Sequence, residues 1–126
     1  MNELVCLEIS IALWFVHVFT QGAFAGSALG MRYLVGARDT IVQPKGSMFS
    51  RASRALANYV ENLGPFVAAD LGLILTGHHG GAGATAWVVA RIVYLPLYMA
   101  GVPVARTICW LISLAGLATM LFRLAS

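Results

Sequence analysis

The sequence has few charged residues. They fill only 10% of its 126 positions, whereas a soluble globular domain is typically about 25% charged. Hydrophobic residues make up 60% of the chain. A small soluble domain leaves a large fraction of its surface in water and cannot hide so much apolar area. The composition therefore excludes a soluble monomer, a disordered chain and a nucleic-acid-binding domain, and it indicates an integral membrane protein.

Cysteine is also scarce. The two cysteines, Cys6 and Cys109, lie in apolar runs, and their spacing suits neither a disulfide framework nor a metal site. We interpret both as small hydrophobic residues within helices. The first ten residues contain Glu3 and Glu8 but no basic residue, unlike the basic start of a signal peptide. We therefore expect the first apolar run to be retained.

Four apolar segments account for most of the chain. The first has 23 residues without Asp, Glu, Lys or Arg, and about 20 residues are enough to cross the hydrocarbon core of a bilayer. No soluble domain or internal repeat interrupts the segments. The sequence therefore predicts a single all-α membrane domain over residues 1–126, with two main loops at Arg32–Arg54 and Gly77–Gly83. Its transmembrane helices are expected at Ile9–Met31, Ala55–Thr76, Ala84–Ala100 and Val102–Phe122.

Basic residues are unevenly shared between the two sides of such a four-helix bundle. Five of the eight lie in the first loop, where Asp39 is the only acidic residue. Cytoplasmic loops of membrane proteins carry an excess of Lys and Arg. We therefore expect a multi-pass protein with this basic first loop in the cytoplasm and both termini outside.

Polar side chains recur at helical spacing inside the apolar segments, where charged groups are costly and usually mark function or a buried pair. At about 100° per residue, three helices each carry them on one face. The alternating direction of the helices brings their arginines and tyrosines to the same side of the membrane, which predicts an arginine-rich pocket open to the cytoplasm. The faces comprise Arg51, Arg54, Asn58 and Glu61 on the second helix, Trp87, Arg91, Tyr94 and Tyr98 on the third, and Arg106, Trp110 and Ser113 on the fourth.

Each of these features also has a structural interpretation. Arg51 and Arg54 could anchor a helix end by reaching to the interface. Tyr94 and Tyr98 could belong to an aromatic belt at the membrane surface. An ion pair between the second and third helices is a further alternative, because Glu61 and Arg91 lie at similar depths.

Three other polar features lie outside the predicted pocket. Asp70 points about 160° away from Arg54 on the second helix, so we assign it to a structural or inter-subunit contact. His17 and Gln21, four residues apart, are interpreted as partners in hydrogen bonds between helices. His78 and His79 lie in a glycine-rich turn. We interpret this turn as a solvated loop and expect no metal site there.

Two segments resemble signatures of the MAPEG family, the membrane-associated proteins in eicosanoid and glutathione metabolism. Residues 51–66 are similar to the R-A-x-R-A-x-x-N-x-x-E-N-x-x-P-F pattern of that family's second helix. The family's third and fourth helices are similar to Ala90-Arg91-x-x-Tyr94-x-x-x-Tyr98-x-x-Gly101, followed by Arg106. The GxRD stretch of the short bacterial members resembles Gly36-Ala37-Arg38-Asp39. The likeness covers nearly the whole chain.

The resemblance implies a homotrimer of four-helix subunits that binds glutathione, as a co-substrate, between neighbouring subunits. It implies that Arg106 is the catalytic residue and stabilises the glutathione thiolate. It also implies a bacterial inner membrane as the location, with Arg32 at the basic end of the first helix. The implied glutathione-binding residues are Arg51, Arg54, Asn58, Glu61, Arg91, Tyr94, Tyr98 and Thr107, the last standing where prostaglandin-forming members have a hydroxyl residue.

These residues suit the chemistry of glutathione. Guanidinium groups bind carboxylates in a bidentate manner, Glu61 could receive the ammonium group, and a nearby cation lowers the pKa of a thiol. The predicted function is a membrane glutathione S-transferase or peroxidase acting on lipophilic electrophiles or lipid hydroperoxides. Its expected partners are copies of itself, the bilayer and lipophilic small molecules, not nucleic acid. The alternative is a non-catalytic family member that serves as a structural subunit or lipid-binding module, because a fold does not fix a function.

Overall fold

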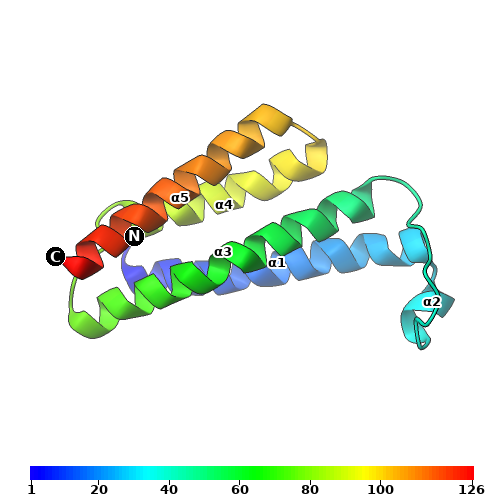
Figure 1. Cartoon of the computed structure of the whole chain (residues 1–126), viewed down its shortest axis with the longest axis horizontal. Coiled ribbons are helices and arrows are strands. Elements are labelled where there is room, and N and C mark those ends of the chain that lie inside the picture. The colour runs from blue at the N-terminus through cyan, green and yellow to red at the C-terminus, as the bar shows by residue number, and fades with distance from the viewer.

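The computed structural model describes all residues 1–126 as four long α-helices and one short helix (Figure 1). α1 lies along α3, α4 lies along α5, and both termini are at the same end of the bundle (Figure 1). The predicted all-helical class is confirmed. In chain order the helices are α1 (Glu3–Leu29), α2 (Met31–Val35), α3 (Met48–Thr76), α4 (Gly83–Ala100) and α5 (Pro103–Ala125).

Three of the long helices, α1, α4 and α5, are long and apolar enough to cross a membrane. α3 is the longest helix, with 29 residues, which corresponds to about 43 Å at 1.5 Å per residue. It is also the most polar of the four, because Arg51, Arg54, Glu61 and Asp70 all lie within it. The membrane class is therefore confirmed by three helices, and a fourth span along α3 stays a prediction.

The ends of the first helix and of the first loop differ from the sequence prediction. α1 begins at Glu3 because the side chain of Asn2 caps it by accepting a hydrogen bond from the backbone amide of Val5 at 2.9 Å. The prediction of one continuous loop over 32–54 is wrong, because α2 forms at its start and α3 begins at Met48. The irregular part is residues 36–47, so Arg51 and Arg54 lie in the first two turns of α3.

Aromatic side chains fill the core where the helices meet. Phe66 of α3 stacks on Trp87 of α4 with ring centroids 3.9 Å apart, and Tyr59 stacks on His17 of α1 at 4.3 Å. The Tyr59 hydroxyl donates a hydrogen bond to the carbonyl oxygen of Ser10 at 2.6 Å. Because an unpaired polar group is costly in hydrocarbon, this bond allows a tyrosine to be buried between α1 and α3.

The two polar residues predicted to join helices differ in their partners. The side chain of Gln21 donates from Nε2 to the hydroxyl of Ser53 on α3 at 3.5 Å, so its interhelical bond is confirmed. His17 instead donates from Nδ1 to the carbonyl oxygen of Leu13 in its own helix, at 2.8 Å. The interhelical prediction is therefore wrong for His17, whose ring joins α1 to α3 by stacking rather than by a hydrogen bond.

α4 and α5 form a close pair joined by a tight corner. Glycines allow the close approach, because a Cβ atom at Gly83 or at Gly116 would lie 2.6 Å from the other residue's carbonyl oxygen. Gly101 ends α4 with φ of 75°, a conformation that glycine adopts easily, and Pro103 begins α5. The corner brings Tyr98, just before it, beside Arg106, just after it.

Candidate functional site

A polar hollow of about 200 Å³ lies between α3, α4 and α5, close to the α4–α5 corner. Tyr94 and Tyr98 are four residues apart on α4, as are Arg106 and Trp110 on α5, and this spacing puts each pair on one helix face. Three helices thus contribute side chains to one place, as the sequence analysis predicted. The lining residues are Asn58, Tyr94, Tyr98, Arg106, Thr107 and Trp110.

Arg106 lies at the side of this hollow, with its guanidinium carbon 4.4 Å from the centroid of the Tyr98 ring. This geometry is a cation–π contact. The Arg106 side chain makes no hydrogen bond within the subunit, so its N–H donors are free for a ligand. The Tyr94 and Tyr98 rings lie 5.5 Å apart, and their hydroxyl groups also have no partner in the subunit.

Arg91 lies beneath the hollow and is completely buried. Its Nη1 atom donates to the side-chain oxygen of Asn58 at 2.7 Å. Its guanidinium carbon lies 5.6 Å from the Trp87 ring centroid and 5.3 Å from that of Tyr94, while Nε and Nη2 have no partner. Arg91 therefore does not line the hollow itself. It orients the side-chain amide of Asn58, which does.

The alternative ion pair between Glu61 and Arg91 is not formed. The Glu61 side chain is exposed on α3, and the partner of Arg91 is Asn58. The physical reason is rotation about the helix axis, because Glu61 lies about 60° away from Asn58 around α3. That rotation turns the amide toward α4 and leaves the carboxylate outside.

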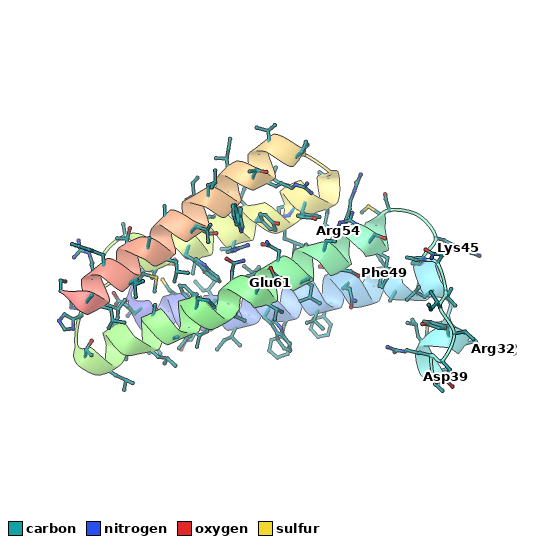
Figure 2. The ribbon with its side chains drawn as sticks, viewed as in Figure 1. Arg32, Asp39, Lys45, Phe49, Arg54 and Glu61 are labelled. Carbon is teal, nitrogen blue, oxygen red and sulfur yellow. The ribbon has the colours of Figure 1, made fainter.

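The other two arginines of α3 have different surroundings. Arg51 is half-buried, and its Nη1 atom donates to the carbonyl oxygen of Met99 at 3.0 Å, at the C-terminal end of α4. Its guanidinium lies directly over Gly101, where a Cβ atom would come within 2.9 Å of Nη2. Helix C-termini carry partial negative charge, so this cation stabilises the α4–α5 corner. Arg54 is exposed on α3, as is Glu61 (Figure 2).

The structure thus brings only some of the predicted site residues together. Asn58, Tyr94, Tyr98, Arg106 and Thr107 line the hollow, and Arg91 contacts Asn58. The hydroxyl of Thr107 donates to the carbonyl oxygen of Pro103 at 2.9 Å. The exposed residues of α3 do not join this group within a single subunit.

The predicted polar face of the fourth helix includes Trp110, and this residue lines the hollow, although it is not among the implied glutathione-binding residues. Its indole N–H is buried without a hydrogen-bond partner. The signal that points to it is its position four residues after Arg106, which places both residues on the same face of α5. A tryptophan in an apolar segment is ordinary core material, so a shared helix face was not enough to predict a ligand contact for Trp110.

Asp70 and the histidine pair lie away from this hollow. Asp70 is fully buried within the subunit, and neither carboxyl oxygen has a hydrogen-bond partner. Burial inside one subunit makes the inter-subunit alternative for Asp70 wrong. His79 is exposed and its Nδ1 atom lies 3.7 Å from a carboxyl oxygen of Glu3. No group of three or more His, Cys, Asp or Glu residues is arranged to hold a metal ion.

Hydrogen-bond donors dominate the hollow. Arg106 and the two phenol groups present N–H or O–H groups, and no acidic residue lines the hollow. Donors of this kind suit an anionic ligand, with the guanidinium forming the strongest bonds. A volume of about 200 Å³ is below the roughly 300–1,000 Å³ of typical small-molecule sites. A tripeptide-sized ligand would therefore extend beyond this hollow.

The three long apolar helices define an α-helical integral membrane protein. A family model described as the MAPEG family matches residues 4–126, and the chain belongs to this family. The resemblance seen in the sequence is therefore confirmed over essentially the whole chain. Membership associates the protein with glutathione or eicosanoid metabolism in membranes. No match was found among curated proteins or among solved structures.

Proposed function

We propose that this protein is a glutathione-dependent transferase or peroxidase of the membrane, with a site completed between subunits of a homotrimer. The observation that carries the proposal is the free guanidinium of Arg106 at the hollow, held over the Tyr98 ring at 4.4 Å. Arginine does not lose its proton in proteins, so it is a permanent cation there. A permanent cation close to the sulfur favours a thiolate over a thiol.

The proposed binding of glutathione rests on two charged side chains exposed on α3, Arg54 and Glu61, which we call the exposed stripe of α3. Arg54 offers a guanidinium for a glutathione carboxylate, and Glu61 offers a carboxylate for its ammonium group. Both side chains are exposed in the single subunit, and the hollow is too small for the whole tripeptide. A neighbouring subunit supplies the missing surface, which is why we place glutathione between subunits.

The chemistry follows from a thiolate held beside Arg106. In transfer, the sulfur attacks an electrophilic carbon, a C–S bond forms, and the displaced electron pair takes up a proton or leaves with the leaving group. In reduction of a hydroperoxide, the sulfur attacks the terminal oxygen and the O–O bond breaks. The alkoxide that leaves takes up the proton that the thiol lost and is released as an alcohol. A second glutathione then converts the sulfenic acid to the disulfide and water. The lipophilic co-substrate reaches the site from the bilayer.

The thiolate's ultraviolet absorbance tests this proposal, measured across a pH titration of the detergent-purified protein with saturating glutathione. We expect a bound thiol with a lowered pKa in the wild type. Arg106→Leu should move that pKa toward the value near 8.5 of a free cysteine thiol. Arg123→Leu, an equal loss of charge at the far end of α5, should leave the titration unchanged. Identical titrations for wild type and Arg106→Leu would remove Arg106 from the mechanism.

A second function, a non-catalytic structural or lipid-binding family member, is favoured by two contacts. Arg51 and Arg91 already have partners inside the subunit, the carbonyl of Met99 and the amide of Asn58. Arginines that are bonded inside the subunit stabilise the fold and need no ligand to do so. The absence of both a glutathione-dependent thermal shift and a thiolate signal in the wild type would support this function instead.

A further inference from the structure

A second hollow, of about 530 Å³, lies in the segment between α1 and α3. We call residues 30–47, which include α2, the α1–α3 loop. The hollow is walled by the end of α1, by α2 and by residues 36–40, and it shares no residue with the hollow at Arg106. In Figure 1 this loop projects beyond the end of the bundle, away from α4 and α5.

The α1–α3 loop is tied into a defined shape. The backbone amide of Lys45 donates to the carbonyl oxygen of Ala28 at 2.9 Å, which closes the loop onto the end of α1. Arg38 donates from Nε and Nη2 to the carbonyl oxygen of Leu34, at 3.2 and 2.8 Å, and so joins two walls of the hollow. A loop with closed ends and internal bonds has the character of a compact functional loop, not of a free linker.

The charge of this hollow is positive. Arg32 and Arg38 both line it, and Asp39 is the single acidic residue there. Arg32 is exposed and makes no hydrogen bond or ion pair with the rest of the chain, and Figure 2 shows it beside Asp39 at the outer edge of the loop. Arg32 offers all of its guanidinium N–H donors and Arg38 offers those of Nη1, which is not bonded to Leu34, and such donors suit the oxygen atoms of a phosphate.

Apolar side chains stand out from the same loop. Ile41 is 94% exposed, Val35 79% and Met31 65%. Met31 and Val35 are four residues apart in α2, so they share one face of that turn. Exposed apolar residues interleaved with arginines are typical of a segment that lies in the membrane interface. The loop begins where α1 ends, which is where a spanning helix leaves the bilayer.

We propose that the α1–α3 loop lies in the membrane interface and binds the phosphate of an anionic phospholipid between Arg32 and Arg38. The exposed apolar residues of the loop enter the acyl region beside that lipid. The occupant is a lipid and not a free anion, because a free anion would leave these apolar side chains in water. The site is separate from the glutathione site and does not depend on that proposal.

Lipid retention measures the binding. The full chain is reconstituted in nanodiscs of phosphatidylcholine and phosphatidylglycerol in equal parts, and native mass spectrometry counts the lipids that stay bound after release. We expect the wild type to retain phosphatidylglycerol preferentially. Arg32→Gln should lower that preference about tenfold or more, because it removes a charge-assisted hydrogen bond to the phosphate in addition to one surface charge. Because Arg32 has no partner in the protein, this substitution leaves the fold intact.

Lys45→Gln is the matched control, since it removes the same charge from the same loop but outside the lining of the hollow. It should lower the lipid preference at most about fivefold, the general effect of one basic residue near an anionic surface. Equal losses in the two variants, or no loss in Arg32→Gln, would overturn the site. Displacement of the lipid by inorganic phosphate would assign the hollow to a free anion and would overturn the proposal as well.

The position of the loop is measured separately with a nitroxide at Ile41, attached through Ile41→Cys in a Cys109→Ser background that retains the buried Cys6. We expect the nitroxide in these nanodiscs to be more accessible to oxygen than to a water-soluble nickel complex. Preference for the nickel complex would place the loop in water. Shielding from both reagents would place it against another subunit. Either result would overturn the interfacial placement.

Discussion

At the scale of single residues, two arginines near one hollow have opposite surroundings. Arg91 is completely buried, contacts two aromatic rings and is hydrogen-bonded to Asn58. Arg106 is half-buried and makes no hydrogen bond in the subunit, although it too lies over a ring. The first arrangement stabilises a fold around a charge, and the second leaves a charge ready for a ligand. The residue type alone does not distinguish these roles.

The bond between Arg91 and Asn58 should matter for stability even without any ligand. Asn58→Ala removes the single protein hydrogen bond of a buried guanidinium. We expect a loss of about 1–3 kcal/mol in the free energy of unfolding. Thermal unfolding in mild detergent without glutathione measures the loss. Asn62→Ala is the control, because that side chain bonds only to a carbonyl of its own helix. An equal effect of the two substitutions would contradict the role assigned to the 2.7 Å bond.

Arg54 tests whether the exposed stripe of α3 holds a ligand. Arg54→Ala should weaken glutathione binding about tenfold or more, since a charge-assisted hydrogen bond contributes roughly 1.5–3 kcal/mol. Isothermal titration of the purified protein measures the affinity, and native mass spectrometry checks the assembly. We expect the assembly to survive. If the assembly dissociates while the residual protein binds glutathione normally, Arg54 has a structural role and the ligand contact is wrong.

At the scale of the helices, the α4–α5 pair is the element that sets the geometry of the hollow. Two glycines let the helices approach, Gly101 turns the chain, and Arg51 reaches from α3 to the carbonyl of Met99. Tyr98 and Arg106 lie on either side of that corner and meet at 4.4 Å. A change in how α4 crosses α5 therefore moves a candidate catalytic group, although neither glycine touches the hollow.

Gly116→Ala tests the crossing. A methyl group there would lie 2.6 Å from the carbonyl oxygen of Gly83, which is backbone and cannot rotate away. Overpacking of this kind costs about 1–3 kcal/mol, so we expect a lower thermal midpoint. Gly22→Ala is the control, because nothing lies within 4 Å of that position in α1 and a helix-interior alanine should stabilise by roughly 0.5–1 kcal/mol. A neutral Gly116→Ala would contradict the close crossing.

At the scale of the whole molecule, one subunit leaves charged residues on an outer face. Arg54 and Glu61 are exposed on α3, the helix that lies between the apolar α1 and the α4–α5 pair. If α3 crosses the bilayer along its predicted span, Ala55–Thr76, Glu61 would meet hydrocarbon, where an unsatisfied polar group costs several kcal/mol. Association of subunits along α3 removes that cost. The same association would complete a hollow that is small for a tripeptide.

We therefore expect a trimer. Native mass spectrometry from mild detergent should show a species of three chains. Glu61→Leu, which replaces an exposed charge on α3 by an apolar side chain, should increase the share of monomer, because it removes one reason for association. Leu75→Asn, at an exposed position near the far end of the same helix, serves as a control for surface changes. A wild type that stays monomeric across several mild detergents would contradict the trimer and the inter-subunit site.

Several features followed from the sequence by itself. Apolar length and the scarcity of charge determined an all-α membrane protein, because hydrocarbon accepts a backbone whose polar groups are paired within the segment. Helical periodicity determined which polar residues share a face, because side chains three or four positions apart are neighbours in any helix. That local rule, together with the alternating direction of the helices, placed Tyr94, Tyr98 and Arg106 in one site. The paired signatures determined the family.

Only the tertiary structure decided which partner each polar face meets. Periodicity does not set the rotation of α3 about its axis, and that rotation turned Asn58 toward Arg91 and left Glu61 outside. The rotation depends on contacts between residues far apart in the chain, such as the stacking of Phe66 on Trp87. The shape of the α1–α3 loop likewise depends on the bond from Lys45 back to Ala28. Long-range packing of this kind has no local signal in the sequence, so it appears only when the helices are assembled.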